Sequence, residues 1–393
     1  MRIIYGVHGY GRGHATRSMA VIDELRQHHE VRVIAGGDAY ELLCRRYPVL
    51  EVDCLRWHYG KSGRRSAWTT LRSAAPQVRD IFTRGPVWQR VADEMQRFVP
   101  QVVISDAEAW THRVARTLSI PRISFDHAGI MAFCRPPLDT LDDIRRRMID
   151  ANAYKGLMGT PQRKLVSSFF KVPVVDDSVA IVPPIMRDEI YRTPASQGDH
   201  VLVYLNNGRV QWTPRLRQAL LGAGVPVRVY GVADRGGEGP ITFRPVDNQG
   251  FIDDLSSCRA VVSTAGNQLV GEAMHYGKAM LVMPEECVEQ RMNALAIARE
   301  GVGEWLPSTD ITAARVASFL ARAARYGANA LSKALDGRRE AMLILERWFA
   351  ELAPDYQPRV QVARNDRQAA SSWAVVHAHA ERQRAVSASR GSM

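Results

Sequence analysis

The first candidate for acid–base chemistry is a histidine that follows a glycine-rich turn near the beginning of the chain. The stretch 6–14 reads GVHGYGRGH and follows a short apolar run, which predicts a strand, a turn and then a helix. Glycines allow close approach of the backbone to a ligand, and His14 would stand at the helix N-terminus, where the dipole disfavours a charged imidazole. A neutral imidazole can take a proton from a hydroxyl group near neutral pH. His14 is therefore a candidate general base, with a polar helix cap as its alternative role.

Two acidic groups follow neighbouring strands of the same half of the chain. Asp106 comes directly after the apolar run 102–105, and Asp126 and His127 come after the run 122–125. Ligands of open α/β sheets gather at the carboxyl ends of the strands, so these side chains are expected near the candidate base. Asp106 could orient the imidazole or act as the base itself. Each of these residues could equally be a turn former or a helix cap.

A second group of candidate residues belongs to a strand–helix–strand pattern at 260–283. The apolar strand 260–264 is followed by Gly266, and Asn267 suits the N-cap of the next helix. The backbone N–H groups of this small-residue turn, with that of Gln268, would point along the helix axis and form a site suited to phosphate. The alternative is an ordinary strand–helix–strand unit with a solvated polar turn.

Carboxylate and amide side chains extend this pattern. Glu272 stands about one and a half turns into the helix, too far along to cap it, and could accept hydrogen bonds from the two hydroxyls of a ribose. Glu289, Gln290 and Asn293 open the following helix, where Glu289 and Asn293 share a face. A sugar ring offers hydroxyls to donors and acceptors alike, so this set suits a sugar. Plain capping residues are the alternative.

The stretch 250–293 resembles the donor-binding half of GT-B glycosyltransferases that use UDP-sugars. The likeness is to the family 28-like group around the bacterial muropeptide N-acetylglucosaminyltransferases and the plant galactolipid synthases. It implies that Phe251 and Ile252 belong to the loop that meets the nucleotide base, and that 263–268 is the diphosphate loop. That loop usually carries paired glycines followed by Ser or Thr, whereas the residues at 265–268 read AGNQ here.

The same resemblance assigns roles to the polar side chains of both halves. It implies that Glu272 binds the ribose and that the pair Glu289 and Gln290 binds the sugar. It extends more weakly to the N-terminus and covers most of residues 1–350, where Gly13 and His14 resemble a Gly-Gly-His element that meets the acceptor. We accordingly expect Gly11, Gly13 and His127 at the acceptor. Direct attack promoted by the base would invert the anomeric centre.

The predicted fold class is α/β, with two Rossmann-like doubly wound domains that face a cleft, as in GT-B proteins. Strands and helices alternate along the chain, which is typical of such sheets. The predicted domains are 1–190 for the acceptor and 191–352 for the nucleotide sugar, with a last helix crossing back and a mobile tail at 353–393. Predicted strands lie at 3–7, 31–35, 49–52, 102–105, 122–125, 201–205, 227–230, 260–264 and 279–283, and residues 234–239 are predicted to form a glycine-rich turn.

Composition sets further limits. The chain has 393 residues, enough for two domains, and no apolar run approaches the roughly 20 residues that cross a bilayer. The sequence begins with an apolar strand and shows no signal-peptide pattern, so we expect a cytoplasmic protein. The five cysteines show no metal-ligand spacing. Transfer in this fold requires no metal or cofactor, because a helix dipole and backbone donors can stabilise the departing diphosphate.

The basic residues are unevenly distributed. The formal net charge is +11, and the stretch 56–97 holds nine basic residues against three acidic ones, interleaved with aromatic residues. The stretch 139–170 adds an amphipathic basic segment. Arginine attracts anionic head groups and tryptophan settles at the lipid–water interface, so we expect contact with an anionic membrane and a lipid-linked or amphipathic acceptor. A solvated helical face, a soluble anionic acceptor and DNA are the alternatives.

The sequence therefore predicts a glycosyltransferase that moves a sugar from a nucleotide donor, with UDP as the first candidate, to an acceptor hydroxyl. An enzyme like the UDP-N-acetylglucosamine 2-epimerases is one alternative, because those enzymes share this architecture and need no acceptor pocket. A basic protein that binds or modifies nucleic acid on the same fold is another.

Overall fold

The computed structural model describes residues 1–56, 67–206, 208–233, 236–245 and 247–356. Residues 1–342 form one compact unit, and residues 343–393 belong to a second. Most of the predicted tail lies outside the described residues, as do the basic and aromatic residues at 57–66.

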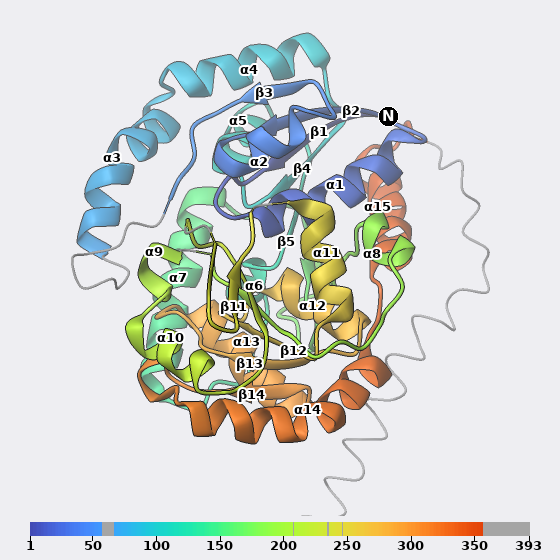
Figure 1. The fold of residues 1–393 in the computed structure, drawn as a ribbon. Coiled ribbons are helices and arrows are strands. Elements are labelled where there is room, and N and C mark those ends of the chain that lie inside the picture. Colours follow the sequence, from blue (N-terminus) through green and yellow to red (C-terminus); the bar gives the residue numbers. More distant parts are fainter. Residues whose placement is uncertain (57–66, 207, 234–235, 246, 357–393) are drawn as a thin grey trace, which may run out of the picture. The chain divides into compact units, whose positions relative to one another are not determined.

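The first sheet has seven strands, all parallel, in the order β3-β2-β1-β4-β5-β6-β7 (Figure 1). Its central strands are short apolar runs that are buried along most of their length, as expected for a parallel sheet covered on both faces. The strands are β1 Arg2–Val7, β2 Glu30–Ala35, β3 Val49–Glu51, β4 Val102–Asp106, β5 Arg122–Asp126, β6 Arg163–Ser167 and β7 Val179–Val182. The strands predicted in this half of the chain are confirmed.

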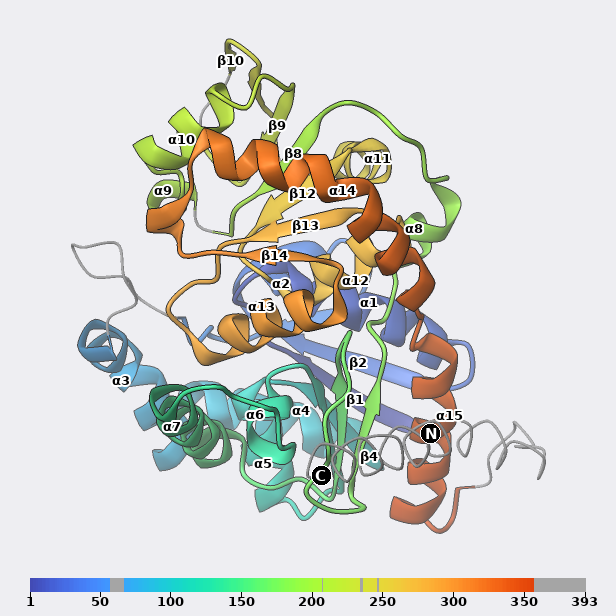
Figure 2. The ribbon, with the colours of Figure 1, turned by 90° about the horizontal axis from the view of Figure 1, so that it is seen from below.

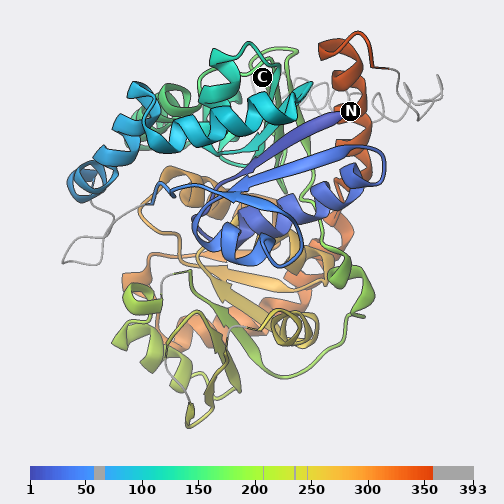
Figure 3. The ribbon, with the colours of Figure 1, turned by 90° about the horizontal axis from the view of Figure 1, so that it is seen from above.

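Helices connect these strands and cover the two faces of the sheet. The helices α1 and α2 lie on one face, and α3 and α4 lie on the other (Figure 3). This is the doubly wound arrangement predicted from the alternation of elements. The helices are α1 Arg12–Arg26, α2 Gly37–Leu43, α3 Ala67–Thr83, α4 Pro86–Phe98, α5 Ala109–Thr117, α6 Gly129–Phe133 and α7 Leu141–Met158.

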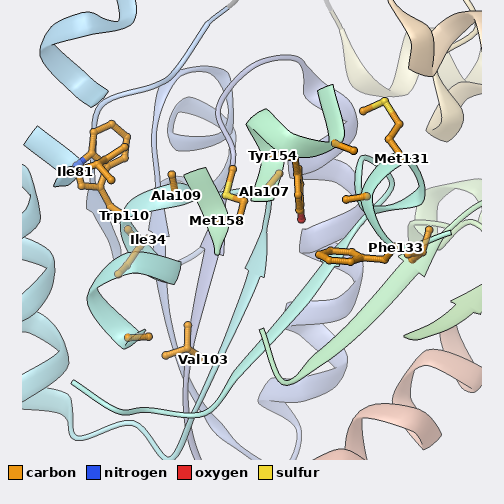
Figure 4. Close-up of a cluster of buried hydrophobic side chains, with 14 of the residues drawn as sticks. Ile34, Ile81, Val103, Ala107, Ala109, Trp110, Met131, Phe133, Tyr154 and Met158 are labelled. Carbon is orange, nitrogen blue, oxygen red and sulfur yellow. The ribbon is translucent and has the colours of Figure 1, made fainter. Parts of the chain in front are cut away.

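A large apolar cluster packs α4, α5, α6 and α7 against the first sheet (Figure 4). Trp110 on α5 is almost fully buried, and its indole Nε1 donates to Asp80 Oδ1 at 2.7 Å, which satisfies the one polar group of that side chain. Phe133 and Tyr154 pack edge to face with ring centroids 5.8 Å apart. The loops that follow β4 and β5 therefore rest on a rigid core.

The second sheet also has seven strands, in the order β10-β11-β9-β8-β12-β13-β14. All neighbours pair in parallel except β10, which forms an antiparallel edge. The predicted turn at 234–239 is therefore wrong in part, because Gly236–Glu238 pairs with Ile241–Phe243 as a short hairpin. The strands are β8 Val201–Tyr204, β9 Val227–Tyr230, β10 Gly236–Glu238, β11 Ile241–Phe243, β12 Ala260–Ser263, β13 Ala279–Val282 and β14 Gly303–Trp305.

Helices cover both faces of the second sheet as well. One apolar cluster joins the sheet to α11 and α12, and another joins its opposite face to α10 and α14 (Figure 2). The helices are α8 Asp188–Arg192, α9 Gly208–Gln211, α10 Pro214–Leu221, α11 Asn248–Ser257, α12 Asn267–His275, α13 Val288–Glu300, the 3₁₀ turn η1 Ser308–Asp310, α14 Ala313–Lys333 and α15 Arg338–Leu352. The predicted boundary at residue 190 falls in the linker between β7 and β8. No helix among the described residues is long and apolar enough to span a bilayer.

Candidate functional site

The candidate base lies at the end of the first sheet, in contact with the acid of the neighbouring strand. His14 is the third residue of α1, which begins after Gly11, whose φ of 85° lies in the region that favours glycine. Strands β1 and β4 are neighbours, so Asp106 at the end of β4 reaches the imidazole, with 2.6 Å between His14 Nδ1 and Asp106 Oδ1. Because Asp106 is ionised and only accepts, His14 Nδ1–H donates to it.

Two side chains that the sequence did not indicate complete this network. Arg17 donates to Asp106 Oδ2 through Nε at 3.1 Å and through Nη2 at 2.6 Å, and its Nη2 also lies 2.7 Å from Oδ1. The Ser18 hydroxyl donates to Oδ2 at 3.0 Å. Burial alone would raise the pKa of Asp106, but the charges of Arg17 and His14 lower it below its usual value. The sequence signal was the spacing, since residues 14, 17 and 18 share one face of a helix.

His8 provides a neutral neighbour for the candidate base. Its ring lies edge to face with that of His14, with 5.2 Å between the centroids. Desolvation, followed by the charge of His14, lowers the pKa of His8 to about 3, so its imidazole is neutral at physiological pH. The ring therefore supports the imidazole of His14 without adding a charge.

Asp126 is occupied by structural contacts. Its Oδ1 accepts from the Gly129 backbone N–H at 2.6 Å, and its Oδ2 accepts from the Tyr154 hydroxyl at 2.6 Å. Burial, and next the charge of Asp106, raise the pKa of Asp126 to about 6. The carboxyl group thus acts as a turn former at the start of α6, which is one of the two roles that the sequence allowed.

His127 and Asn293 contact each other and join the two sheets. His127 is buried, with its Nδ1 2.8 Å from Ser167 O and its Nε2 3.0 Å from Asn293 Oδ1. Asn293 is fully buried on α13 and donates through Nδ2 to Ala265 O at 3.0 Å. Ligand contacts were predicted for both side chains, and in this structure their polar atoms are already engaged within the protein.

The turn before α12 matches the predicted phosphate site in part. Gly266 is the N-cap and makes no side-chain cap, so the prediction of Asn267 as the N-cap is wrong. The Asn267 side chain instead donates to Ser167 O at 3.2 Å and accepts from Phe169 N–H at 3.3 Å, because these backbone groups of the first sheet lie within its reach. Ala265 has a φ of 70°, in the region that favours glycine, where related loops carry glycine.

The N-termini of α1 and α12 meet. The two helices are in contact between the sheets (Figure 2), and a Cβ atom built on Gly13 would lie 3.5 Å from Gln268 Cβ. Neither helix has a side-chain cap, and a Cβ atom built on Gly11 or Gly266 would meet no atom within 4 Å. Two N-termini with open space beside them attract an anion, and at α1 the Asp38 carboxylate already accepts from the Gly11 N–H at 3.1 Å. Gln268 Oε1, buried at this point, has no hydrogen-bond partner.

The predicted ribose acid lies in a buried ion pair. Glu272 is 2% exposed and Arg187 is 6% exposed. Arg187 Nε donates to Glu272 Oε1 at 3.1 Å, and its Nη2 donates to Oε2 at 3.0 Å. This partner was not predicted, because Arg187 lies 85 positions earlier, in the linker between the sheets.

The predicted sugar-binding pair opens α13, as expected. Gln290 is buried, and its Oε1 accepts from the Glu285 backbone N–H at 2.8 Å. Glu289 is half-buried. Burial lowers the pKa of His127, and the nearby charge of Glu289 acts against this by raising it. The carboxylate of Glu289 and the amide nitrogen of Gln290 are thus placed at the same end of the helix.

The segment predicted as a loop that meets the nucleotide base is helical, so the prediction of a loop is wrong. Phe251 and Ile252 lie inside α11, because Asp247 caps this helix by accepting from the Gly250 N–H at 2.6 Å. Ile252 is fully buried in the core. Phe251 is half-buried and packs edge to face on Tyr204, with 5.4 Å between the centroids.

In the parts of the chain that the structure describes, no three His, Cys, Asp or Glu side chains group closely enough to hold a metal ion. The groups of the site that attract an anion are the N-termini of α1 and α12, because Arg17 and Arg187 are each paired with a buried carboxylate. This distribution of charge suits an anionic group with several oxygens, such as a diphosphate.

Comparison with known proteins identifies this arrangement. The profile of glycosyl transferase family 1 matches residues 1–324. No curated protein sequence matches the chain. The solved structure of the glycosyltransferase VinC in complex with dTDP has a TM-score of 0.58 and 15% identity, and the match covers 89% of this chain and 100% of VinC.

Two further structures have the same fold. LpCGTa in complex with UDP has a TM-score of 0.59 and 16% identity, over 89% of this chain and 99% of the other. MurG of Acinetobacter baumannii has a TM-score of 0.55 and 15% identity, and the match covers 88% of this chain and 99% of MurG. The family profile and the two doubly wound sheets show that the chain belongs to glycosyl transferase family 1 and is a glycosyltransferase of the GT-B fold.

Proposed function

We propose that the protein transfers a sugar from a nucleotide diphosphate donor to an acceptor hydroxyl, with His14 as the general base. The observation that carries the proposal is the 2.6 Å contact between His14 Nδ1 and the buried carboxylate of Asp106. Asp106 fixes the tautomer in which Nε2 is the acceptor, and it stabilises the imidazolium that forms. The His14 side chain is 24% exposed, which leaves room for an acceptor to approach.

In the proposed step, the acceptor oxygen forms a bond to the anomeric carbon while its proton moves to His14 Nε2. The bond between that carbon and the diphosphate oxygen breaks, and its electron pair leaves with the diphosphate. Attack from the face opposite the leaving group inverts the anomeric centre. Gly11 and Gly13, beside the base, allow an acceptor to lie close to the backbone.

The leaving diphosphate is stabilised where α1 and α12 meet. The N–H groups at Gly266, Asn267 and Gln268 and the dipoles of both helices offset its developing charge, so the transfer proceeds without a metal ion. Glu289 and Gln290 bind the donor sugar, and Glu272 contacts the ribose. The solved complexes with UDP and with dTDP support a nucleotide diphosphate donor, with UDP as the first candidate.

The acceptor that we propose is amphipathic or lipid-linked, with the protein bound reversibly to an anionic membrane. Helix α7 supports this, because its apolar side chains Leu141, Met148 and Ile149 are 85%, 54% and 57% exposed. Arg145 and Lys155 are exposed on the same helix, so a lipid surface would meet both apolar and basic groups. The predicted basic helix at 139–170 is shorter than expected, because it ends at Met158 and the following basic residues belong to β6.

The test is a stability screen followed by an assay for release of the nucleotide. UDP or dTDP should raise the midpoint of thermal unfolding, since a ligand of the folded state stabilises it. With the matching nucleotide sugar, in EDTA, the diphosphate should be released only when an acceptor is present. Release without acceptor, with conversion of the donor sugar to an epimer, would favour the epimerase alternative and contradict transfer.

A further inference from the structure

The carboxylate expected to hold the ribose has little capacity left for it. A carboxylate offers about four lone-pair positions on its two oxygens. Glu272 Oε1 accepts from Arg187 Nε at 3.1 Å and from Gln268 Nε2 at 3.2 Å, and Oε2 accepts from Arg187 Nη2 at 3.0 Å. A ribose whose two hydroxyls both donate would need a free position on each oxygen. Only Oε2 retains one.

Arg187 is held in place from a second side. Its Nη1 donates to the Asn248 side chain at the start of α11, while its other two nitrogens engage Glu272. The Arg187 side chain is 7% exposed, and the Glu272 side chain 3%. A guanidinium that is bidentate on one partner and bonded to another is oriented by both, and its removal would leave a buried charge without a partner. A ribose therefore meets the ion pair and not a free carboxylate.

A neutral acceptor lies beside the pair. Gln268 Oε1 is buried and has no hydrogen-bond partner, and the nitrogen of the same amide already donates to Glu272. A hydroxyl that donates to a neutral amide oxygen gains much less than one that donates to a carboxylate. The second ribose hydroxyl can thus be bound only weakly.

Resting on the proposed function, we propose that Arg187 makes donor binding insensitive to the ribose 2′-hydroxyl. The substrates are then nucleoside diphosphate sugars of both the ribo and the 2′-deoxyribo class. In this assignment, the 3′-hydroxyl of the ribose donates to Glu272 Oε2, and loss of the 2′-hydroxyl changes the affinity little. Arg187 acts on specificity by occupying Glu272 and positioning it, without taking part in the reaction.

The experiment compares UDP with dUDP, which differ only at this hydroxyl, by isothermal titration of the full chain. We expect the two dissociation constants to agree within about tenfold, because a hydroxyl bound by a free carboxylate is worth roughly tenfold or more. A preference for UDP of more than about tenfold overturns the inference. If neither nucleotide binds, the donor site itself is wrong and the proposed function falls with it.

Variants test the role of Arg187. Arg187→Gln removes the guanidinium donors from both oxygens of Glu272, which frees a position on Oε1 as well, and it should raise the preference for UDP by at least about fivefold. An unchanged preference in a folded Arg187→Gln protein overturns the role of this residue. Asn248→Ala removes only the outer contact at an exposed position, so it tests the same effect if Arg187→Gln does not fold, and it should shift the ratio in the same direction. Gln249→Ala, the next exposed residue of α11, is the matched control and should leave the ratio unchanged.

Discussion

At the scale of single residues, Asp126 should make stability depend on pH. Its pKa in the folded protein is raised to about 6, chiefly by burial, so the protonated form is favoured on folding. The stability that it contributes is fully present below the pKa of the unfolded chain and is lost as pH rises through about 6. Asp126→Asn should therefore gain stability relative to the wild type between pH 4 and pH 7, by on the order of 3 kcal/mol.

Urea unfolding of both proteins at several pH values measures this difference. Thr312→Ala, which removes the hydroxyl that accepts from the Arg315 N–H at the start of α14, is the control, and its effect should vary little with pH. A difference between Asp126→Asn and wild type that stays constant from pH 4 to pH 7 would contradict the assignment.

Part of this site could be predicted from the sequence. His14 and Asp106 were candidates because each follows an apolar strand, and parallel strands bring such positions to one edge of the sheet. Arg17 and Arg187 were not candidates, since the spacing along the chain does not show which carboxylate an arginine will contact. Their partners lie 89 and 85 positions away, and only the folded sheets bring them together.

At the scale of elements, the predicted strands were confirmed wherever an apolar run was bounded by turn residues. The errors arose where two local structures compete for the same residues. Asn267 is a good N-cap by type, but the backbone of the first sheet offers its side chain closer partners. Phe251 and Ile252 were assigned to a loop, although Asp247 caps a helix three residues before Gly250.

Helix α12 offers a test at this scale, because a glycine brings it close to the linker. A Cβ atom built on Gly271 would lie 2.5 Å from Pro184 Cβ, so Gly271→Ala should push α12 away from the linker and displace its N-terminus. We expect a loss of about 1–3 kcal/mol in unfolding free energy and weaker nucleotide binding.

The control is Gly156→Ala on α7, where the new Cβ would meet no atom within 4 Å. That change should stabilise the protein by about 0.5–1 kcal/mol and leave nucleotide affinity as it is. If Gly271→Ala and the control gave the same unfolding free energy and the same nucleotide affinity, the close packing of α12 on the linker would not contribute to the donor site.

At the scale of the whole molecule, the alternation of strands and helices was enough to predict two doubly wound sheets. Several of the aromatic and basic residues expected to bind a membrane, Trp57, Tyr59, Arg64 and Arg65, lie outside the described residues, as does the side chain of Trp68. The exposed apolar side chains of α7 were not singled out from the sequence. A helix pattern gives the face of a residue but not whether a neighbouring element covers that face.

Sedimentation with vesicles tests the membrane proposal. Binding should rise with the fraction of anionic lipid and fall with salt, because both apolar and basic groups meet the surface. Replacing Leu141, Met148 and Ile149 together by serine should reduce binding severalfold without loss of fold, since all three are exposed. The control replaces Leu331 and Leu335 by serine, because these two leucines are also exposed but do not belong to α7. Equal loss with both variants, or retention of duplex DNA in place of vesicles, would contradict lipid binding through α7.

His14 is proposed to remove the proton of the acceptor, and the turnover of a His14→Ala variant measures that role. With a donor and an acceptor found by the screen, we expect this variant to lower kcat by roughly 10²–10⁴-fold, the usual range for a general base. The affinity for UDP should remain close to that of the wild type, because the proposed diphosphate contacts are backbone N–H groups and helix dipoles, which the substitution leaves in place. Turnover near the wild-type rate in a folded His14→Ala protein would contradict the account and would move the base to another group at the ends of β4 and β5.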